Sequence, residues 1–158
     1  MPFQVAVCGP RDATDVERDA AHRVGQLLAE RGVVVICGGG AGVMGAVAAG
    51  ARSRGGVVVG VRPGDSRDGA SADLTAVVVT NLGEARNAVI VWSADAVIVV
   101  GGSWGTLSEL ALAKRRGGVP VVSLHGWRVV DAAGAEVPGI HHVATPEEAV
   151  RLTPAPPT

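Results

Sequence analysis

Tyrosine is absent from the 158-residue chain, and lysine occurs once, at Lys114. The chain therefore lacks the Tyr-Lys pair that one class of dehydrogenases uses, and it has no Gly-Lys-Ser/Thr run for a phosphate-binding P-loop. Pyridoxal phosphate needs a Schiff-base lysine. Lys114 stands in an Ala-Lys-Arg-Arg-Gly-Gly stretch that is typical of an exposed helix end. Lysine-dependent chemistry, decarboxylation included, is not expected.

Charge excess, long apolar runs and abundant cysteine are missing as well. The formal net charge is -1, which gives no sign of nucleic-acid or anionic-membrane binding. No run of 18 apolar residues is present to span a bilayer, and the first residues do not resemble a signal peptide. The two cysteines, Cys8 and Cys37, form no disulfide framework, so we expect free thiols and a cytoplasmic protein. No spacing of histidines suits a metal, and none is expected.

The hydrophobic segments that are present are short and rich in valine. Each is apolar almost throughout, as expected for strands buried on both faces of a parallel sheet. Segments with helical spacing lie between most of them, and the alternation predicts a doubly wound, mostly parallel, three-layer Rossmann-like α/β fold. We expect a single domain over residues 1–152 and a Pro-rich frayed tail at 153–158. The expected strands are Phe3–Cys8, Val33–Cys37, Val57–Val61, Ala76–Thr80, Asp95–Val100 and Val119–Leu124, and the expected helices are Thr14–Arg31, Gly42–Arg54, Leu82–Ser93, Ser103–Arg116 and one that begins near Pro146.

Some features of this domain are predicted only in part. The first three strands should run in the order 3-2-1, but either the fourth or the fifth strand can lie on the other side of the first. Four cap residues stand three positions before an acid and predict capping boxes: Thr14 with Glu17, Asn81 with Glu84, Thr106 with Glu109, and Thr145 with Glu148. Residues 63–72 form a polar loop able to cover a site, and residues 127–140 are expected to add an edge hairpin.

Glycine is in excess, with 23 residues, and eight of them fall in two loops that follow the second and fifth expected strands. Ligands of open parallel sheets bind outside the carboxyl ends of the strands. Glycine lets the backbone approach a phosphate, and a helix start offers free N–H groups. The loops therefore predict a site for a small phosphorylated molecule, with packing of the helices as the alternative. The expected ligand contacts in the loops are Gly9, Gly39, Gly40, Gly42, Gly101, Gly102, Ser103, Gly105 and Thr106.

A dinucleotide site is a second possibility for the first glycine loop. Residues 40–45 match the pattern G-x-G-x-x-G, but they follow the second strand rather than the first. The next strand ends in Arg62, where a ribose-binding acid is usual, and an arginine suits the 2′-phosphate of NADP.

Two charged residues carry the expected chemistry. Glu109 follows the second glycine loop, and Arg86 lies near the start of the preceding expected helix, Leu82–Ser93. Glu109 either completes a capping box with Thr106 or places a carboxylate at the mouth of a phosphate site. Arg86 either binds a phosphate with its planar guanidinium or pairs with a nearby acid. Trp104 either stacks on a base or makes a packing or dimer contact.

These motifs together resemble those of the LONELY GUY (LOG) proteins, long labelled lysine decarboxylases. Gly38–Gly45 resembles the first glycine motif of that family, and Gly101–Glu109 resembles its Pro-Gly-Gly-x-Gly-Thr-x-x-Glu motif. Arg86 lies where the family has its essential arginine, and the similarity covers residues 3–150. The resemblance implies a phosphoribohydrolase that releases ribose 5-phosphate from a nucleoside 5′-monophosphate without a cofactor, as a homodimer or larger assembly. Arg86 and Glu109 would be its catalytic residues.

The chain departs from the LOG pattern at several positions. Val100 replaces the proline of the motif, and Asn87, which we place among the ligand contacts, stands where the hydrolases usually have lysine. The Arg-Asn pair and the compact length look more like the subgroup of molybdenum-cofactor carrier proteins. That subgroup binds a phosphorylated pterin and need not catalyse a reaction, so a carrier is the alternative to a hydrolase.

Overall fold

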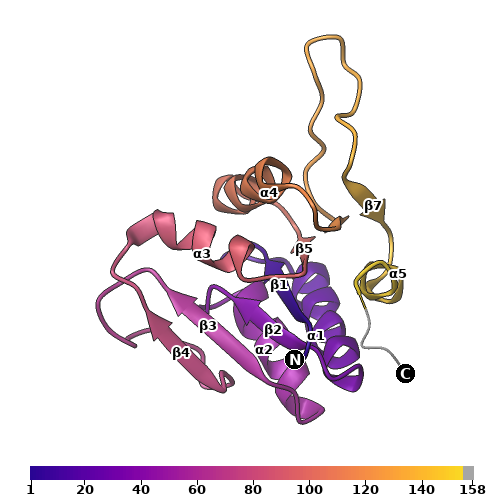
Figure 1. The fold of residues 1–158 in the computed structure, drawn as a ribbon. Helices are drawn as coiled ribbons and strands as arrows, with labels where there is room; N and C mark the ends of the chain where they lie inside the picture. Colours follow the sequence, from indigo (N-terminus) through magenta and orange to yellow (C-terminus); the bar gives the residue numbers. More distant parts are fainter. Residues whose placement is uncertain (155–158) are drawn as a thin grey trace.

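Residues 1–154 are described by the computed structural model, and they form one α/β domain around a parallel sheet (Figure 1). Within this range the sheet has seven strands in the order β4-β3-β2-β1-β5-β6-β7, every pair parallel. The predicted Rossmann-like fold is confirmed. The strands are β1 (Gln4–Cys8), β2 (Val34–Cys37), β3 (Val58–Arg62), β4 (Ala76–Val79), β5 (Ala96–Val100), β6 (Val121–Leu124) and β7 (His141–Val143).

The centre of the sheet settles the strand order that the sequence left open. β5 lies beside β1, with Val5 opposite Ala96 and Cys8 opposite Val99, while β4 lies at the far edge next to β3. The five residues of β5 are buried, as expected for a strand covered on both faces, whereas β4 is largely exposed. The strand order therefore reverses between β1 and β5, which is where ligands of such sheets bind.

Helices cover both faces of the sheet (Figure 1). On one face α1 (Asp15–Glu30) packs against α2 (Val43–Ser53) and α5 (Pro146–Arg151), and on the other α3 (Arg86–Trp92) packs against α4 (Trp104–Arg116). Alternate residues of β1 enter the two cores: Val5 and Val7 face α1 and α2, and Ala6 and Cys8 face α3 and α4. Cys8 and Cys37 enter opposite cores and are free thiols.

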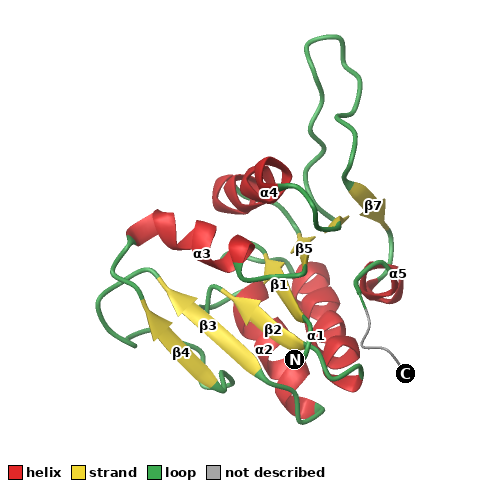
Figure 2. Ribbon diagram, in the orientation of Figure 1, coloured by secondary structure: helices red, strands yellow, loops and turns green. Residues whose placement is uncertain are grey.

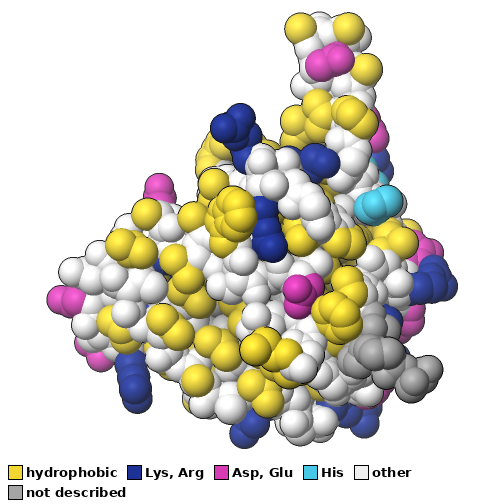
Figure 3. Space-filling model, in the orientation of Figure 1, with side chains coloured by type: hydrophobic (Ala, Val, Ile, Leu, Met, Phe, Trp, Pro, Cys, Tyr) yellow, Lys and Arg dark blue, Asp and Glu magenta, His cyan; other side chains and the backbone are white. Residues whose placement is uncertain are grey.

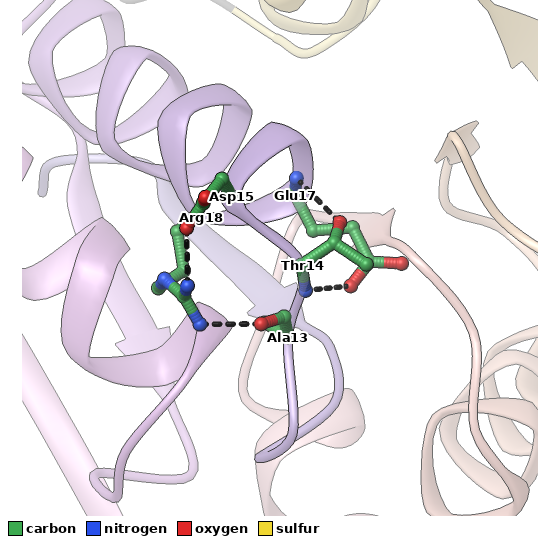
Figure 4. A network of polar contacts seen from close by, with 5 residues as sticks. All are labelled: Ala13, Thr14, Asp15, Glu17 and Arg18. Carbon is green, nitrogen blue, oxygen red and sulfur yellow. Dashed lines mark hydrogen bonds and ion pairs between the residues drawn. The ribbon is translucent and has the colours of Figure 1, made fainter.

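The helix starts agree with the sequence at two of the four predicted caps. Thr14 and Glu17 form the capping box of α1, with reciprocal bonds of 3.2 and 2.9 Å (Figure 4). The Thr145 hydroxyl accepts from the Glu148 N–H at the start of α5. The box predicted at Asn81 is wrong. A 3₁₀ turn, η1 (Gly83–Ala85), occupies the expected first turn, and α3 begins only at Arg86.

The segment from residue 125 to 140 projects from the body of the domain as a long loop (Figure 2). One antiparallel bridge joins Val130 to Glu136, so the expected hairpin is present only as a minimal one, and the sheet edge is β7 instead.

At the other end of the described range, the Thr153 hydroxyl donates to the Val150 carbonyl and the residue is buried. The rest of the expected tail, residues 155–158, lies outside the described residues. None of the helices found in residues 1–154 has the length and apolar character needed to cross a membrane.

Candidate functional site

A cleft of about 340 Å³ opens at the carboxyl edge of the sheet, where the strand order reverses. Three segments form most of its wall: the loop after β1, the start of α3 and the start of α4. Of the residues expected at the site, the structure brings seven together here: Gly9, Arg86, Asn87, Ser103, Gly105, Thr106 and Glu109.

The start of α4 presents polar groups to this cleft. Ser103 is extended at φ -159° and caps the helix, since its hydroxyl oxygen accepts from the Thr106 N–H at 3.1 Å. The two hydroxyl groups lie 2.9 Å apart. The predicted capping box of Thr106 with Glu109 is therefore wrong, and the Glu109 side chain is free for another role. Helix starts attract anions because their N–H groups and dipole point outward.

Glu109 lines the cleft from α4. Its carboxylate lies close enough to the thiol of Cys8, the last residue of β1, for the two groups to influence each other's pKa. Burial raises the pKa of Glu109 above its ordinary value, while the Cys8 thiol and the charge of Arg86 act in the opposite direction. Burial, followed by the Glu109 charge, raises the pKa of Cys8 well above that of a free thiol. A partly desolvated carboxylate of this kind is typical of functional sites.

Arg86 faces the same cleft from the first residue of α3. Its Nη1 donates to the carbonyl oxygens of Gly38 at 2.8 Å and Val61 at 2.6 Å, which anchors the guanidinium at the ends of β2 and β3. Burial lowers the pKa of Arg86, and the charge of Glu109 partly offsets this effect. The four ion pairs found in residues 1–154 are partly exposed, and none includes Arg86 or Glu109. The two charged groups therefore share one cleft without pairing directly.

Asn87 connects the two helices that carry these charges. It is buried, and its Nδ2 donates to the Ser108 hydroxyl at 3.1 Å. That hydroxyl in turn donates to the Gly105 carbonyl at 2.6 Å. Asn87 thus ties α3 to the first turns of α4, both of which line the cleft.

Several of the predicted glycines do not line this cleft, because protein atoms occupy the space beside them. A Cβ on Gly42 would lie 2.2 Å from the Arg11 carbonyl oxygen, so this glycine lets the loop after β1 rest on α2. A Cβ on Gly101 would lie 2.6 Å from Cδ of Glu17, the capping residue shown in Figure 4. A Cβ on Gly102 would lie 2.2 Å from Cδ1 of Trp127. At these positions close packing, the alternative weighed from the sequence, accounts for glycine.

Gly39 and Gly40 lie at the end of β2, beside arginine side chains rather than in the main cleft. A Cβ on Gly39 would lie 3.1 Å from Cδ of Arg62. Gly40 lines a neighbouring cleft together with Arg62 and Arg86. The first glycine loop therefore lies beside the guanidinium groups of Arg62 and Arg86.

Six lining residues were not predicted as contacts: Pro10, Arg11, Met44, Pro63, Gly83 and Glu84. The signal that identifies Pro10, Arg11 and Pro63 is their position just after a parallel strand, since such loops share the carboxyl edge. Trp104, by contrast, is exposed and packs edge-to-face on Trp127, with ring centroids 5.1 Å apart. It does not line the cleft, so the packing alternative applies to it.

A profile of the SLOG cluster4 family matches residues 2–150. A cytokinin riboside 5′-monophosphate phosphoribohydrolase of Mycobacterium tuberculosis is 35% identical over 130 residues, covering 77% of this chain and 70% of that protein.

Two solved structures resemble nearly the whole chain. The molybdenum cofactor binding protein of Rippkaea orientalis superposes with a TM-score of 0.86 at 31% identity, covering 96% of this chain and 95% of that one. The molybdenum cofactor carrier protein of Chlamydomonas reinhardtii gives a TM-score of 0.79 at 27% identity, with coverage of 96% and 95%. The sequence resemblance to LOG proteins and to the carrier subgroup is thus confirmed.

Proposed function

This chain belongs to the SLOG cluster4 family, and from that premise we propose that it hydrolyses the bond between base and ribose in a nucleoside 5′-monophosphate. The observation that carries the proposal is the pair of Glu109 and Arg86, which face one cleft beside the start of α4 without pairing to each other. The phosphoribohydrolase of M. tuberculosis, 35% identical, supports the choice of reaction.

In the proposed complex the 5′-phosphate lies at the start of α4. Ser103, Gly105 and Thr106 line the cleft there, and the positive end of the helix dipole favours an anion. Gly105 has no side chain to hinder the approach, since a Cβ at this position would meet only the Ser103 hydroxyl at 3.9 Å. Binding at this end places the ribose over the centre of the cleft, between Glu109 and Arg86.

We assign to Glu109 the stabilisation of the positive charge that develops in the reaction. The C1′–N bond breaks and its electron pair leaves with the base, so positive charge forms on the ribose, as in other glycoside cleavages. A carboxylate beside C1′ stabilises that charge and orients the attacking water, whose oxygen bonds to C1′ and whose proton passes to the departing base. In this proposal the Arg86 guanidinium, which lines the same cleft, neutralises phosphate or steadies the base.

A direct assay tests this proposal. The purified protein is incubated with the 5′-monophosphates of adenosine, guanosine, cytidine, uridine and isopentenyladenosine, and free base and ribose 5-phosphate are measured. We expect release of both products in equal amounts from at least one of them. Absence of turnover across the panel by folded protein would contradict hydrolysis.

A carrier function is the second candidate, favoured by the two structural neighbours that cover 96% of the chain. Asn87, which replaces the lysine usual in LOG-type hydrolases, is already engaged with Ser108. A carrier predicts that phosphorylated pterins or nucleotides raise the unfolding temperature without being cleaved, since ligands stabilise the state that binds them.

The pH dependence of hydrolysis follows from the environment of Glu109. Because burial raises its pKa above the ordinary 4.5 and the carboxylate form is required, kcat/KM should fall on the acid side around a midpoint above pH 4.5. The Cys8 thiol lowers this pKa, so Cys8→Ala should move the acid limb to higher pH. Cys37→Ala is the matched control, since Cys37 enters the other core. A limb that shifts equally in both variants contradicts the role given to Cys8.

Assembly into a homodimer or larger oligomer also stays a proposal. Apolar side chains are exposed on β4 and around α3, namely Val78, Val79, Leu82 and Trp92. Figure 3 shows hydrophobic groups reaching the surface near α3 and α4. A second copy of the chain would cover such a surface.

A further inference from the structure

A second cleft, of about 220 Å³, adjoins the first at the ends of β2 and β3. The two clefts share Arg11, Met44, Pro63 and Arg86 as lining residues, so one ligand can extend from one into the other. The proposed hydrolysis uses only the first cleft and leaves this space without a role.

The second cleft is lined by three arginines, Arg11, Arg62 and Arg86, and by no acidic residue of the described chain. Arg62 and Arg86 converge, because the Nη1 atoms of both point at the Gly38 carbonyl oxygen, at 3.5 and 2.8 Å. Nη2 of Arg62 donates to the Asp68 carbonyl at 3.2 Å. Among residues 1–154, only neutral backbone carbonyls therefore hold the Arg62 guanidinium.

Buried donors of these arginines also remain unsatisfied. Nε of Arg62 and Nε of Arg86 are buried and have no hydrogen-bond partner within residues 1–154. Burial is the main cause that lowers the pKa of Arg86; the charge of Glu109 opposes this effect, and the charge of Arg62 adds to it, as expected of two cations close together. Repulsion between the two guanidinium groups carries a free-energy cost that an anion between them reduces.

Two glycines keep the Arg62 guanidinium accessible. A Cβ on Gly40 would lie 3.0 Å from its Nη1, and a Cβ on Gly69 would lie 3.2 Å from its Nη2. Both glycines line the second cleft. The Gly69 loop is anchored beside it, since the Ser71 N–H donates to the Gly39 carbonyl at 2.9 Å. A side chain at either position would crowd the space beside the guanidinium.

We propose that this second cleft, the Arg62 subsite, binds a second phosphate group of the ligand whose first phosphate lies at the start of α4. The inference rests on the proposed function for the position of the first phosphate. It makes a nucleotide with two phosphates, rather than a monophosphate, the preferred ligand class. A second phosphate between Arg62 and Arg86 accepts charge-assisted hydrogen bonds from guanidinium groups that, within residues 1–154, donate only to backbone carbonyls.

Binding measurements with three adenosine nucleotides test this proposal: the 5′-monophosphate, the 5′-diphosphate and the 2′,5′-bisphosphate. The 2′,5′-bisphosphate carries its second phosphate on the ribose, as NADP does, whereas the 5′-diphosphate carries it on the first phosphate. Comparing the two shows which position of the second phosphate the subsite binds. Calorimetry should show that one of the two bisphosphorylated ligands binds at least about 10-fold more tightly than the monophosphate, the ratio expected for a hydrogen bond to a charged group. Arg62→Gln should abolish that preference and leave monophosphate affinity within about threefold.

Two further variants keep the result interpretable. Arg62→Lys retains a positive charge and should keep part of the preference, and Arg128→Gln removes an equal charge from a surface ion pair and should keep all of it. Unfolding temperatures of all variants establish that they are folded. If the monophosphate binds but neither bisphosphorylated ligand binds more tightly, the Arg62 subsite is wrong and the proposed function stands. If none of the three binds, both are wrong.

Discussion

Replacing Glu109 by glutamine should reduce kcat/KM for release of ribose 5-phosphate from the preferred monophosphate by about 100-fold or more. Removal of a positioned acid–base group typically costs about 10²–10⁴ in rate. Glutamine is isosteric with glutamate, so the space that the Glu109 side chain occupies beside the cleft stays filled. The loss should therefore come from the missing negative charge, with the fold unchanged. Initial rates and the unfolding temperature are the measurements.

Glu84→Gln is the control for this variant. Glu84 also lines the cleft, but it is exposed on η1, so the same change of charge there should alter kcat/KM by less than about threefold. A Glu109→Gln protein that keeps full activity would remove Glu109 from the reaction. If the wild type shows no turnover and the Glu109→Gln protein still binds nucleotide, the two results together favour the carrier function.

The strands could be predicted from the sequence because burial on both faces leaves an apolar run that is visible without any partner. Their order could be predicted only in part. The residues of β5 do not indicate which strand β5 pairs with, because pairing joins segments that are far apart in the chain. In the structure Val97 lies opposite Ala6 of β1. The switch point, and with it the position of the cleft, follows from this pairing.

The start of α4 shows that the capping-box pattern, which considers only neighbouring residues, does not always predict the cap. Thr106-x-x-Glu109 fits the capping-box pattern, and the sequence therefore predicts Thr106 as the cap of this helix. The structure uses Ser103, because Glu109 instead faces the cleft with Cys8 and Arg86. An interaction from β1 and another from α3 decide the role of Glu109, and neither is adjacent in sequence.

The glycine loops were predicted at the correct edge of the sheet, but most of their glycines serve the protein's own contacts. Gly38, for example, would place a Cβ 2.8 Å from Nη1 of Arg86, and Gly101 rests on Glu17. The sequence cannot tell a glycine that leaves room for a ligand phosphate from one that leaves room for a side chain of the protein itself. The difference depends on which atoms lie beside the glycine in the folded chain. The contacts with Arg62 and Arg86 distinguish them here.

Replacing Arg86 by leucine should affect both stability and binding. The guanidinium donates to the carbonyls of Gly38 and Val61, and hydrogen bonds to charged groups contribute about 1.5–3 kcal/mol each. Since Arg86 is only partly buried, we expect a loss in the free energy of unfolding on the order of 3 kcal/mol. Affinity for the monophosphate should fall by at least about 10-fold, because the cleft loses a partly buried cation. Urea titration and calorimetry measure the two effects.

Arg116 separates the structural part of this effect from the ligand-binding part. Nη1 of Arg116 also donates to two carbonyls, those of Val91 and Ala94, but it lies at the far end of α4 and does not line either cleft. Arg116→Leu should therefore lose comparable stability and keep its affinity for nucleotide. If both variants lose affinity equally, Arg86 acts only by holding β2 and β3 in place. If only Arg86→Leu loses it, the guanidinium contacts the ligand, and the carbonyl bonds serve to present it to the cleft.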